Sequence, residues 1–144
     1  MDEHEALAAF EKALQSHEPA FGRFFLARLL DLDITYPEGK CLIRFPVRDF
    51  LFNPQGSLHG GIIATVMDIS MGHLLQQTNR PGGATLEMKV QYLKPLTLGM
   101  ATCEARFLSA GRNIAFLESR LYDDQNQLAA FSSSTWKVLS ARVP

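Results

Sequence analysis

The stretch NPQGSLHGGIIATVMDIS, from Asn53 to Ser70, contains the helix on which the fold depends. From Ile62 to Leu75 the chain is apolar on nearly every side of a helical wheel, yet Asp68 lies in the middle. A helix of this kind has to be enclosed by the rest of the protein. A carboxylate within it lowers stability unless a partner pairs with it or a function uses it. Asp68 is therefore the first candidate for a functional residue.

The sequence on both sides of this helix predicts strands. Before it, residues alternate between apolar and polar over 28–36 and 41–47, and the turn at 37–40 joins these segments into a hairpin. After the breaker at 79–83, the alternation recurs over 85–93, 101–108 and 113–122, and the turn at 123–126 leads into a last strand at 128–138. Only a sheet built from these segments can enclose the helix. We expect an α+β protein in which an antiparallel sheet of five or six strands wraps around one long central helix, the arrangement called the hot dog fold.

Length and charge exclude several classes of protein. We expect one domain over 1–144, with a short helical segment at about 1–27. The net charge of −1 argues against nucleic-acid binding, which requires a basic patch or stripe. Uncharged runs such as 62–67 are shorter than the roughly 18–20 residues of a membrane span. Cys41 and Cys103 lie far apart in strand-like contexts, as expected of reduced thiols in a cytoplasmic protein.

The N-terminal segment predicts a short amphipathic helix over 6–14, because Leu7, Phe10 and Leu14 fall on one helical face. Pro19 suits the start of a second helical turn, where its missing N–H is not needed. The acidic start of the chain differs from the basic start and apolar middle of a signal peptide.

Small residues dominate the face of the central helix that carries Asp68. Residues three, four, seven and eight positions apart share a helical face. Counted from Asp68, that face holds Gly60, Gly61, Ala64, Thr65, Met71 and Gly72. Apart from Met71 these side chains are small, so either a second helix or a ligand can approach the backbone closely.

The start of the helix, at His59-Gly60-Gly61, offers unpaired backbone donors. The first N–H groups of a helix lack intrahelical partners, and glycines leave them open to a ligand oxygen. Such donors, aimed at a developing oxyanion, contribute about 3–4 kcal/mol each to catalysis. Asp68 lies about 12 Å further along the axis, too far from Gly60 for one small reaction centre. Two such helices packed antiparallel in a homodimer would bring Asp68 of one chain to Gly60 of the other.

Structural roles are the alternatives for these residues. Asp68 would then bond to the backbone or to Thr65, since buried polar groups find partners. The glycine pair would form a tight turn, His59 would cap the helix, and His73 would be structural or exposed. The His, Cys and carboxylate residues do not have the spacing of a metal site. The chain also lacks a G-x-S-x-G elbow and a Cys–His nucleophile motif.

The pattern Asn53-x-x-Gly56-x-x-His59-Gly60-Gly61-x6-Asp68 resembles the signature of the hot dog fold acyl-CoA thioesterases, in the phenylacetate-degradation (PaaI-like) branch. The resemblance covers about three quarters of the chain, from the first hairpin to the strand of Trp136. It does not cover the N-terminal helical segment. The motif is fairly specific because Asn, Gly, His-Gly-Gly and Asp all fall in register.

The resemblance implies catalytic roles for five residues. The Gly60 N–H would polarise the thioester carbonyl, and Asp68, facing it from the other subunit, would act as general base or as nucleophile. Asn53 would hold the substrate carbonyl or the attacking water. Thr85, ahead of the strand that follows the helix, would position water. His59 would support the loop and the thioester end.

Substrate contacts follow from the same comparison. The open backbone of Gly61 would lie at the thioester end, and Arg112 and Asn113 would touch the nucleotide part of coenzyme A. Many relatives carry a second basic residue where this chain has Asn113, which weakens the expected phosphate binding. Phe52, next to Asn53, would line an acyl pocket, or it would pack in the core or at an interface.

The expected function is therefore hydrolysis of an acyl-CoA to a free acid and CoA, by a homodimer or a dimer of dimers. Polarisation of the carbonyl and a base suffice for a thioester, so we expect no metal and no organic cofactor. Two alternatives remain: a non-catalytic domain that binds acyl-CoA, and an acyl-thioester hydratase or dehydratase. The acyl group, the pathway and the choice between base and nucleophile are not determined by the sequence.

Overall fold

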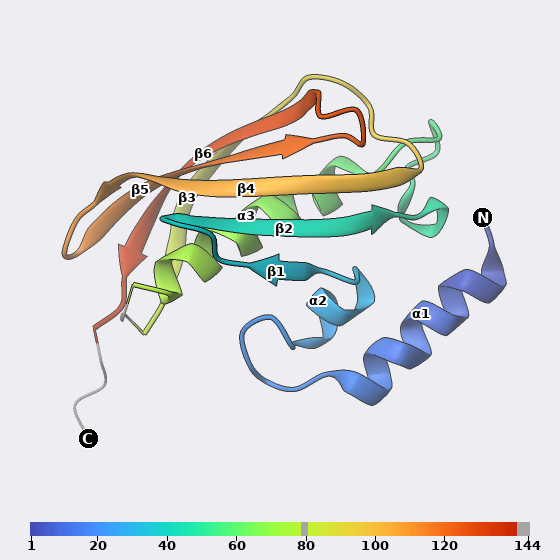
Figure 1. Cartoon of the computed structure of the whole chain (residues 1–144), viewed down its shortest axis with the longest axis horizontal. Helices are drawn as coiled ribbons and strands as arrows, with labels where there is room; N and C mark the ends of the chain where they lie inside the picture. Colours follow the sequence, from blue (N-terminus) through green and yellow to red (C-terminus); the bar gives the residue numbers. More distant parts are fainter. Residues whose placement is uncertain (79–80, 141–144) are drawn as a thin grey trace.

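The computed structural model describes residues 1–78 and 81–140, which form a six-stranded antiparallel sheet with one long helix packed against it (Figure 1). The strand order is β1-β2-β4-β5-β6-β3. The strands are β1 Asp33–Thr35, β2 Lys40–Val47, β3 Gly83–Tyr92, β4 Gly99–Ala110, β5 Ile114–Tyr122 and β6 Leu128–Val138. The helices are α1 Glu3–Ser16, α2 Phe25–Leu29 and α3 Gly60–Gln76, with a 3-10 turn η1 at Asp49–Leu51. The expected architecture is confirmed.

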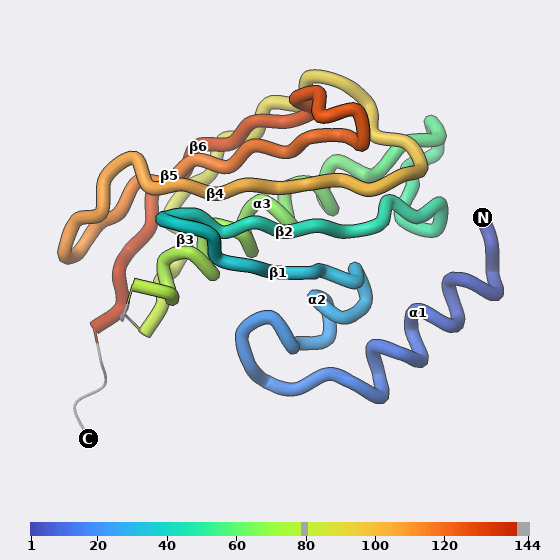
Figure 2. Tube along the Cα trace, in the orientation of Figure 1, coloured from blue at the N-terminus to red at the C-terminus, as the bar shows by residue number. Residues whose placement is uncertain are grey.

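Helix α3 is the central helix that the apolar pattern predicts. It begins at Gly60, and the His59 side chain caps it by accepting a hydrogen bond at Nδ1 from the Gly61 N–H at 2.8 Å. The helix contacts strands β2 to β6 (Figure 2). Its buried side chains include Val66, Met67 and others that fill the space under the sheet. Burial of each such side chain stabilises the fold by about 1.5–3 kcal/mol.

The sheet contributes alternate side chains to the same core. Cys41 of β2 and Cys103 of β4 are fully buried, and neither forms a disulfide. Burial raises the pKa of the Cys41 thiol to about 12 and that of Cys103 to about 11, so both remain protonated and unreactive. Ser119 of β5 lies 3.1 Å from the Cys103 sulfur and 3.0 Å from the hydroxyl of Ser70. The prediction of reduced core thiols is confirmed.

The first predicted strand is partly wrong. The alternation over 28–36 predicts a strand, but α2 extends to Leu29 and β1 covers only Asp33–Thr35. Leu30 and Leu32 donate helix-type hydrogen bonds back to earlier carbonyls, and Asp31 then ends the helix with a φ of 54°. Both leucines are buried, so the end of a short helix produces the same period of two as a strand.

The N-terminal segment also differs from the prediction. Helix α1 forms, but its apolar residues Leu7, Phe10 and Leu14 are exposed. Pro19 lies in the turn that precedes α2 and does not open the helix, which begins at Phe25. The turn folds back against α3, where the Phe21 ring packs edge-on against His73 with 5.0 Å between centroids.

Strand β3 lies at one edge of the sheet, paired only with β6. The alternation predicts that Leu86, Met88, Val90 and Tyr92 share one apolar face, opposite Glu87, Lys89 and Gln91. Met88 and Val90 are half-buried, but Leu86 and Tyr92 are exposed. Leu86 lies at a bulge, where the register shifts between Thr85 and Glu87, and Tyr92 is the last residue of the edge strand. Within the described residues the outer edge of β3 has no neighbouring strand, and a second chain can pair with it.

Candidate active site

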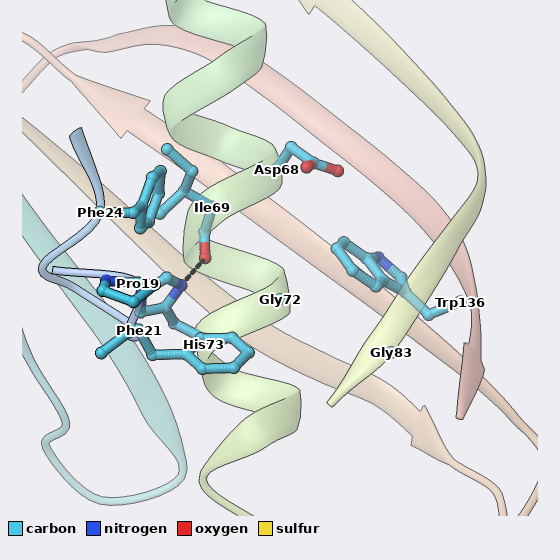
Figure 3. A pocket seen from close by; sticks show the side chains of 10 residues that line it. Pro19, Phe21, Phe24, Asp68, Ile69, Gly72, His73, Gly83 and Trp136 are labelled. Carbon is cyan, nitrogen blue, oxygen red and sulfur yellow. Dashed lines mark hydrogen bonds between the residues drawn. The ribbon is translucent and has the colours of Figure 1, made fainter. Parts of the chain in front are cut away.

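Asp68 lies near the middle of α3, half-buried, with its carboxylate on the side of the helix that faces β3 (Figure 3). The Thr85 hydroxyl, at the start of β3, donates a hydrogen bond of 2.7 Å to Asp68 Oδ1. This contact joins two of the predicted site residues that are 17 positions apart in sequence. The hydroxyl holds the carboxylate in one orientation, and among the described residues the second oxygen accepts no hydrogen bond, so it can bind a water molecule.

Two hollows meet at Asp68. The first, of about 400 Å³, is here called the aromatic pocket, because it is lined by Phe21, Phe24, His73 and Trp136 together with Pro19, Ala20, Asp68, Ile69, Gly72 and Gly83. The second, of about 480 Å³, is called the helix-face groove and is lined by Phe24, Leu26, Ala64, Thr65, Asp68, Ile69 and Met88. Asp68 therefore lines both hollows, whose other lining side chains are mostly apolar.

The aromatic pocket lies against the face of α3 that carries Asp68, Gly72 and His73. Figure 3 shows Phe24 on one side of the helix, Trp136 on the other and the Phe21 ring in front of the helix. A Cβ on Gly72 would lie 3.1 Å from the Trp136 ring, so the glycine allows the tryptophan to approach the backbone. The small-residue stripe noted in the sequence is, at this position, part of a pocket wall.

The start of α3 forms a second, separate part of the candidate site. Tyr92, at the end of β3, donates its hydroxyl to the Gly60 carbonyl oxygen at 2.9 Å. Its ring lies so close that a Cβ on Gly60 would be 3.2 Å from Cε1. A cleft of about 290 Å³ opens beside them and is lined also by Asn53, Ser57 and Lys94. In the described part of the chain the Gly60 N–H makes no hydrogen bond, whereas that of Gly61 is bonded to His59.

Asn53 and His59 shape the loop that leads into the helix. The Asn53 side-chain oxygen accepts from the Gln55 N–H at 2.9 Å, and its amide donates to the Ser57 hydroxyl at 3.3 Å. These bonds hold the 53–57 turn and place Asn53 in the cleft with Gly60. His59 acts as the helix cap.

The other predicted contacts lie elsewhere in the chain. Arg112 and Asn113 are exposed at the tip of the β4–β5 hairpin, where the Asn113 carbonyl accepts from Val138. Phe52 is half-buried against the core and bridges to Leu58. Of these three residues, none lines the aromatic pocket, the helix-face groove or the cleft at Gly60.

Sequence reasoning missed the aromatic residues of the site. Tyr92 is one of four alternating apolar residues of its strand, and its hydroxyl contact with Gly60 has no local signal. Phe21 and Phe24 lie in the N-terminal segment, outside the motif. Trp136 lies 68 positions after Asp68 and meets the helix only through folding.

The donor atoms of the site are not arranged for a metal ion. Over residues 1–78 and 81–140, no group of three or more His, Cys, Asp or Glu side chains converges on one point. Among the same residues, no helix has the length and apolar character to cross a membrane.

Comparisons with known proteins identify the family to which the chain belongs. Residues 55–130 match the model of the thioesterase superfamily. The chain is 30% identical over 114 residues to human acyl-coenzyme A thioesterase 13, covering 78% of this chain and 76% of the relative. The structure of the BH2602 protein from Bacillus halodurans with CoA aligns with a TM-score of 0.86 at 26% identity, over 98% of this chain and 95% of that one.

The E. coli PaaI protein from the phenylacetic acid degradation operon shares the fold, with a TM-score of 0.79 at 18% identity over 92% of this chain and 97% of that one. The chain belongs to the thioesterase superfamily, and its fold is the hot dog fold expected from the helix and sheet pattern.

The Thr85 hydroxyl provides a first test of the Asp68 environment. Replacing Thr85 with Val removes the donor to Asp68 and should lower kcat for thioester hydrolysis about tenfold, since a hydrogen bond to a charged group contributes about 1.5–3 kcal/mol. Thr85→Ser keeps the hydroxyl and should retain most of the activity. Steady-state kinetics on both variants checks this, and equal activity in Thr85→Val and Thr85→Ser would contradict it.

The pH dependence of stability tests the environment of His73, which lines the aromatic pocket. Burial lowers the pKa of His73 below its ordinary value of 6.5, although its Nδ1 contact with the Ile69 carbonyl at 2.9 Å acts in the opposite direction. Among the described residues its Nε2 has no hydrogen-bond partner. The unfolded chain therefore takes up a proton at a higher pH than the folded chain, and stability falls as the pH drops below about 6.5.

His73→Phe should flatten the dependence of stability on pH, because the variant keeps an aromatic ring and loses the titrating imidazole. Urea unfolding at pH 7.5 and 5.5 measures it, with the difference between the two pH values compared in wild type and variant. The same loss of stability on acidification in both proteins would show that His73 contributes nothing to it.

Proposed function

We propose that this protein is an acyl-CoA thioesterase that hydrolyses an acyl-CoA to a free acid and coenzyme A. The observation that carries the proposal is the Asp68–Thr85 pair, with Asp68 in the lining of an apolar pocket. Asp68 lies on the same helix whose first N–H, at Gly60, has no hydrogen-bond partner among the described residues. The BH2602 structure contains CoA, and a relative is named acyl-coenzyme A thioesterase, which supports a CoA thioester as substrate.

The chemistry requires two groups at one carbonyl. The Gly60 N–H donates to the thioester oxygen and stabilises the negative charge that develops on it. Asp68 either takes a proton from a water molecule that attacks the carbonyl carbon, or attacks that carbon itself to form an anhydride that water then opens. In both cases the C–S bond breaks, the thiolate leaves as coenzyme A and is protonated, and no metal or organic cofactor is needed.

The two groups belong to different subunits in this proposal. The hollows around Asp68 and the cleft at Gly60 have no lining residue in common. About 12 Å of helix separates the two residues within one chain. Antiparallel packing of two α3 helices along the small residues Ala64 and Thr65 would bring each Asp68 to the partner's Gly60. The open edge of β3 supplies a second surface for the same homodimer.

The first experiment measures thiol release from acyl-CoAs of two to sixteen carbons and from aryl-CoAs, with the oligomeric state determined in parallel by light scattering. The proposal expects hydrolysis of at least one class by a dimer or a dimer of dimers. Binding of acyl-CoA without release of thiol would favour a non-catalytic binding domain. Addition of water across an enoyl-CoA, with the thioester intact, would favour a hydratase.

A further inference from the structure

Phe24 separates the two hollows that meet at Asp68. The aromatic pocket and the helix-face groove share three lining residues, Phe24, Asp68 and Ile69. Asp68 and Ile69 belong to α3, so Phe24 is the part of the dividing wall that another segment contributes. It lies in the N-terminal turn just before α2, half-buried, with its ring 6.2 Å from the ring of His73. That turn lies outside residues 55–130, which carry the family match.

The two hollows differ in what can occupy them. The helix-face groove contains Ala64 and Thr65, the small residues that face the partner helix in the proposed dimer. The aromatic pocket is built from rings, with Phe21 packed edge-on against His73 on one side and Trp136 on the other. Gly72 contributes no side chain to this pocket, and the Trp136 ring lies close to its backbone. An apolar group that extends from a carbonyl at Asp68 fits the aromatic pocket.

We propose that the aromatic pocket holds the apolar part of the acyl group and that Phe24 limits the size of acyl group that fits. This inference rests on the proposed function, because it identifies where the acyl part of that substrate lies. Without the Phe24 side chain, the aromatic pocket of about 400 Å³ would gain the volume of that ring. Phe24 is a specificity-determining residue here and takes no part in bond breaking.

The test compares Phe24→Ala with Phe10→Ala, a matched replacement on α1 that lines neither hollow. Phe24→Ala should raise kcat/KM for long acyl-CoAs at least tenfold relative to acetyl-CoA, because a change of one or a few methylene-sized groups in an apolar pocket is worth about 10–200-fold in discrimination. Phe10→Ala should keep the wild-type ratio. Phe24→Leu, which retains an apolar side chain, provides a smaller change if the alanine variant is unstable.

A second measurement detects a ligand in the aromatic pocket without requiring hydrolysis. Trp136 is the single tryptophan of the chain and lines the pocket, so its fluorescence reports what enters. In an Asp68→Asn background, lauroyl-CoA should change the emission, whereas coenzyme A alone should not. Ala20→Phe, placed in the same pocket, should reduce the change with lauroyl-CoA.

The outcomes separate this inference from the proposed function. If wild type hydrolyses no thioester but lauroyl-CoA changes the Trp136 emission, the proposed function fails and the pocket assignment stands. If wild type hydrolyses acyl-CoAs and Phe24→Ala leaves the chain-length ratio unchanged, the assignment of Phe24 is overturned. An equal emission change with coenzyme A alone overturns the placement of the acyl group.

Discussion

Replacing Asp68 with Asn should reduce kcat for thioester hydrolysis at least a hundredfold, because a positioned general base or nucleophile contributes about 10²–10⁴ to the rate. The amide has nearly the shape of the carboxylate and can still accept the Thr85 hydroxyl, which is 2.7 Å from Asp68 Oδ1. The change therefore removes the charge and the basicity while the side-chain contact is kept. Thiol release under saturating substrate measures the effect.

The matched control for this variant is Asp33→Asn, an exposed position at the start of β1. It should retain wild-type activity, and both variants should show the wild-type circular dichroism and elution volume. Full activity in a folded, dimeric Asp68→Asn protein would show that the carboxylate is structural and that the proposed mechanism is wrong.

Gly60→Ala should lower kcat by about 10–100-fold, somewhat less than the 10²–10³ measured for complete removal of an oxyanion donor. The added Cβ would lie 3.2 Å from Cε1 and 3.3 Å from Cζ of Tyr92, so the ring or the first helical turn has to shift. A shift of the helical turn moves the Gly60 N–H away from the thioester oxygen, and a shift of the ring disturbs the hydroxyl bond that holds the Gly60 carbonyl. Alanine favours helices more than glycine does, so the backbone itself gains stability from the change.

Tyr92→Leu provides the companion variant for Gly60→Ala. With the ring removed, the added Cβ meets no aromatic atoms, and the double variant should regain part of the kcat lost in Gly60→Ala alone. The single Tyr92→Leu variant, which loses the hydroxyl bond to the Gly60 carbonyl, supplies the baseline for this cycle. Wild-type kcat in Gly60→Ala would argue against an oxyanion role for this residue.

The central helix and most strands are predictable because their patterns have one explanation. A segment that is apolar on every side can only be a buried helix, and α3 begins at the glycines where the cap residue His59 indicates. The alternation over 101–108 and 113–122 falls in β4 and β5, strands that have neighbours on both sides. Where a strand is paired on both sides and buried on one face, period two and structure agree.

The errors occur where other factors set the burial pattern. Leu30 and Leu32 are buried at the end of α2, and a left-handed Asp31 between them imitates the alternation of a strand. In β3 the bulge after Thr85 and the open edge expose side chains that alternation assigns to the core. Neither the bulge nor the partner that covers an edge leaves a signal in the local sequence.

The candidate site likewise contains residues that the sequence indicates and residues that only the fold brings together. The sequence indicates Asp68 and Gly60 because a charged residue in an apolar helix and glycines at a helix start are anomalies in their own segments. Thr85 follows from the family resemblance, and the structure places it against Asp68. Phe24 and Trp136 are ordinary aromatic residues in their segments, and only the fold brings them to the same pocket.

The N-terminal turn of residues 17–24 forms one wall of the aromatic pocket but belongs to neither the sheet nor α3. The groups proposed for bond breaking, in contrast, are held by α3 and by the sheet. Under the two proposals, the residue that limits the acyl group and the groups that break the thioester bond thus lie in separate stretches of the chain. A substitution in the short turn would then change which acyl groups are accepted and leave Asp68, Thr85 and Gly60 in place.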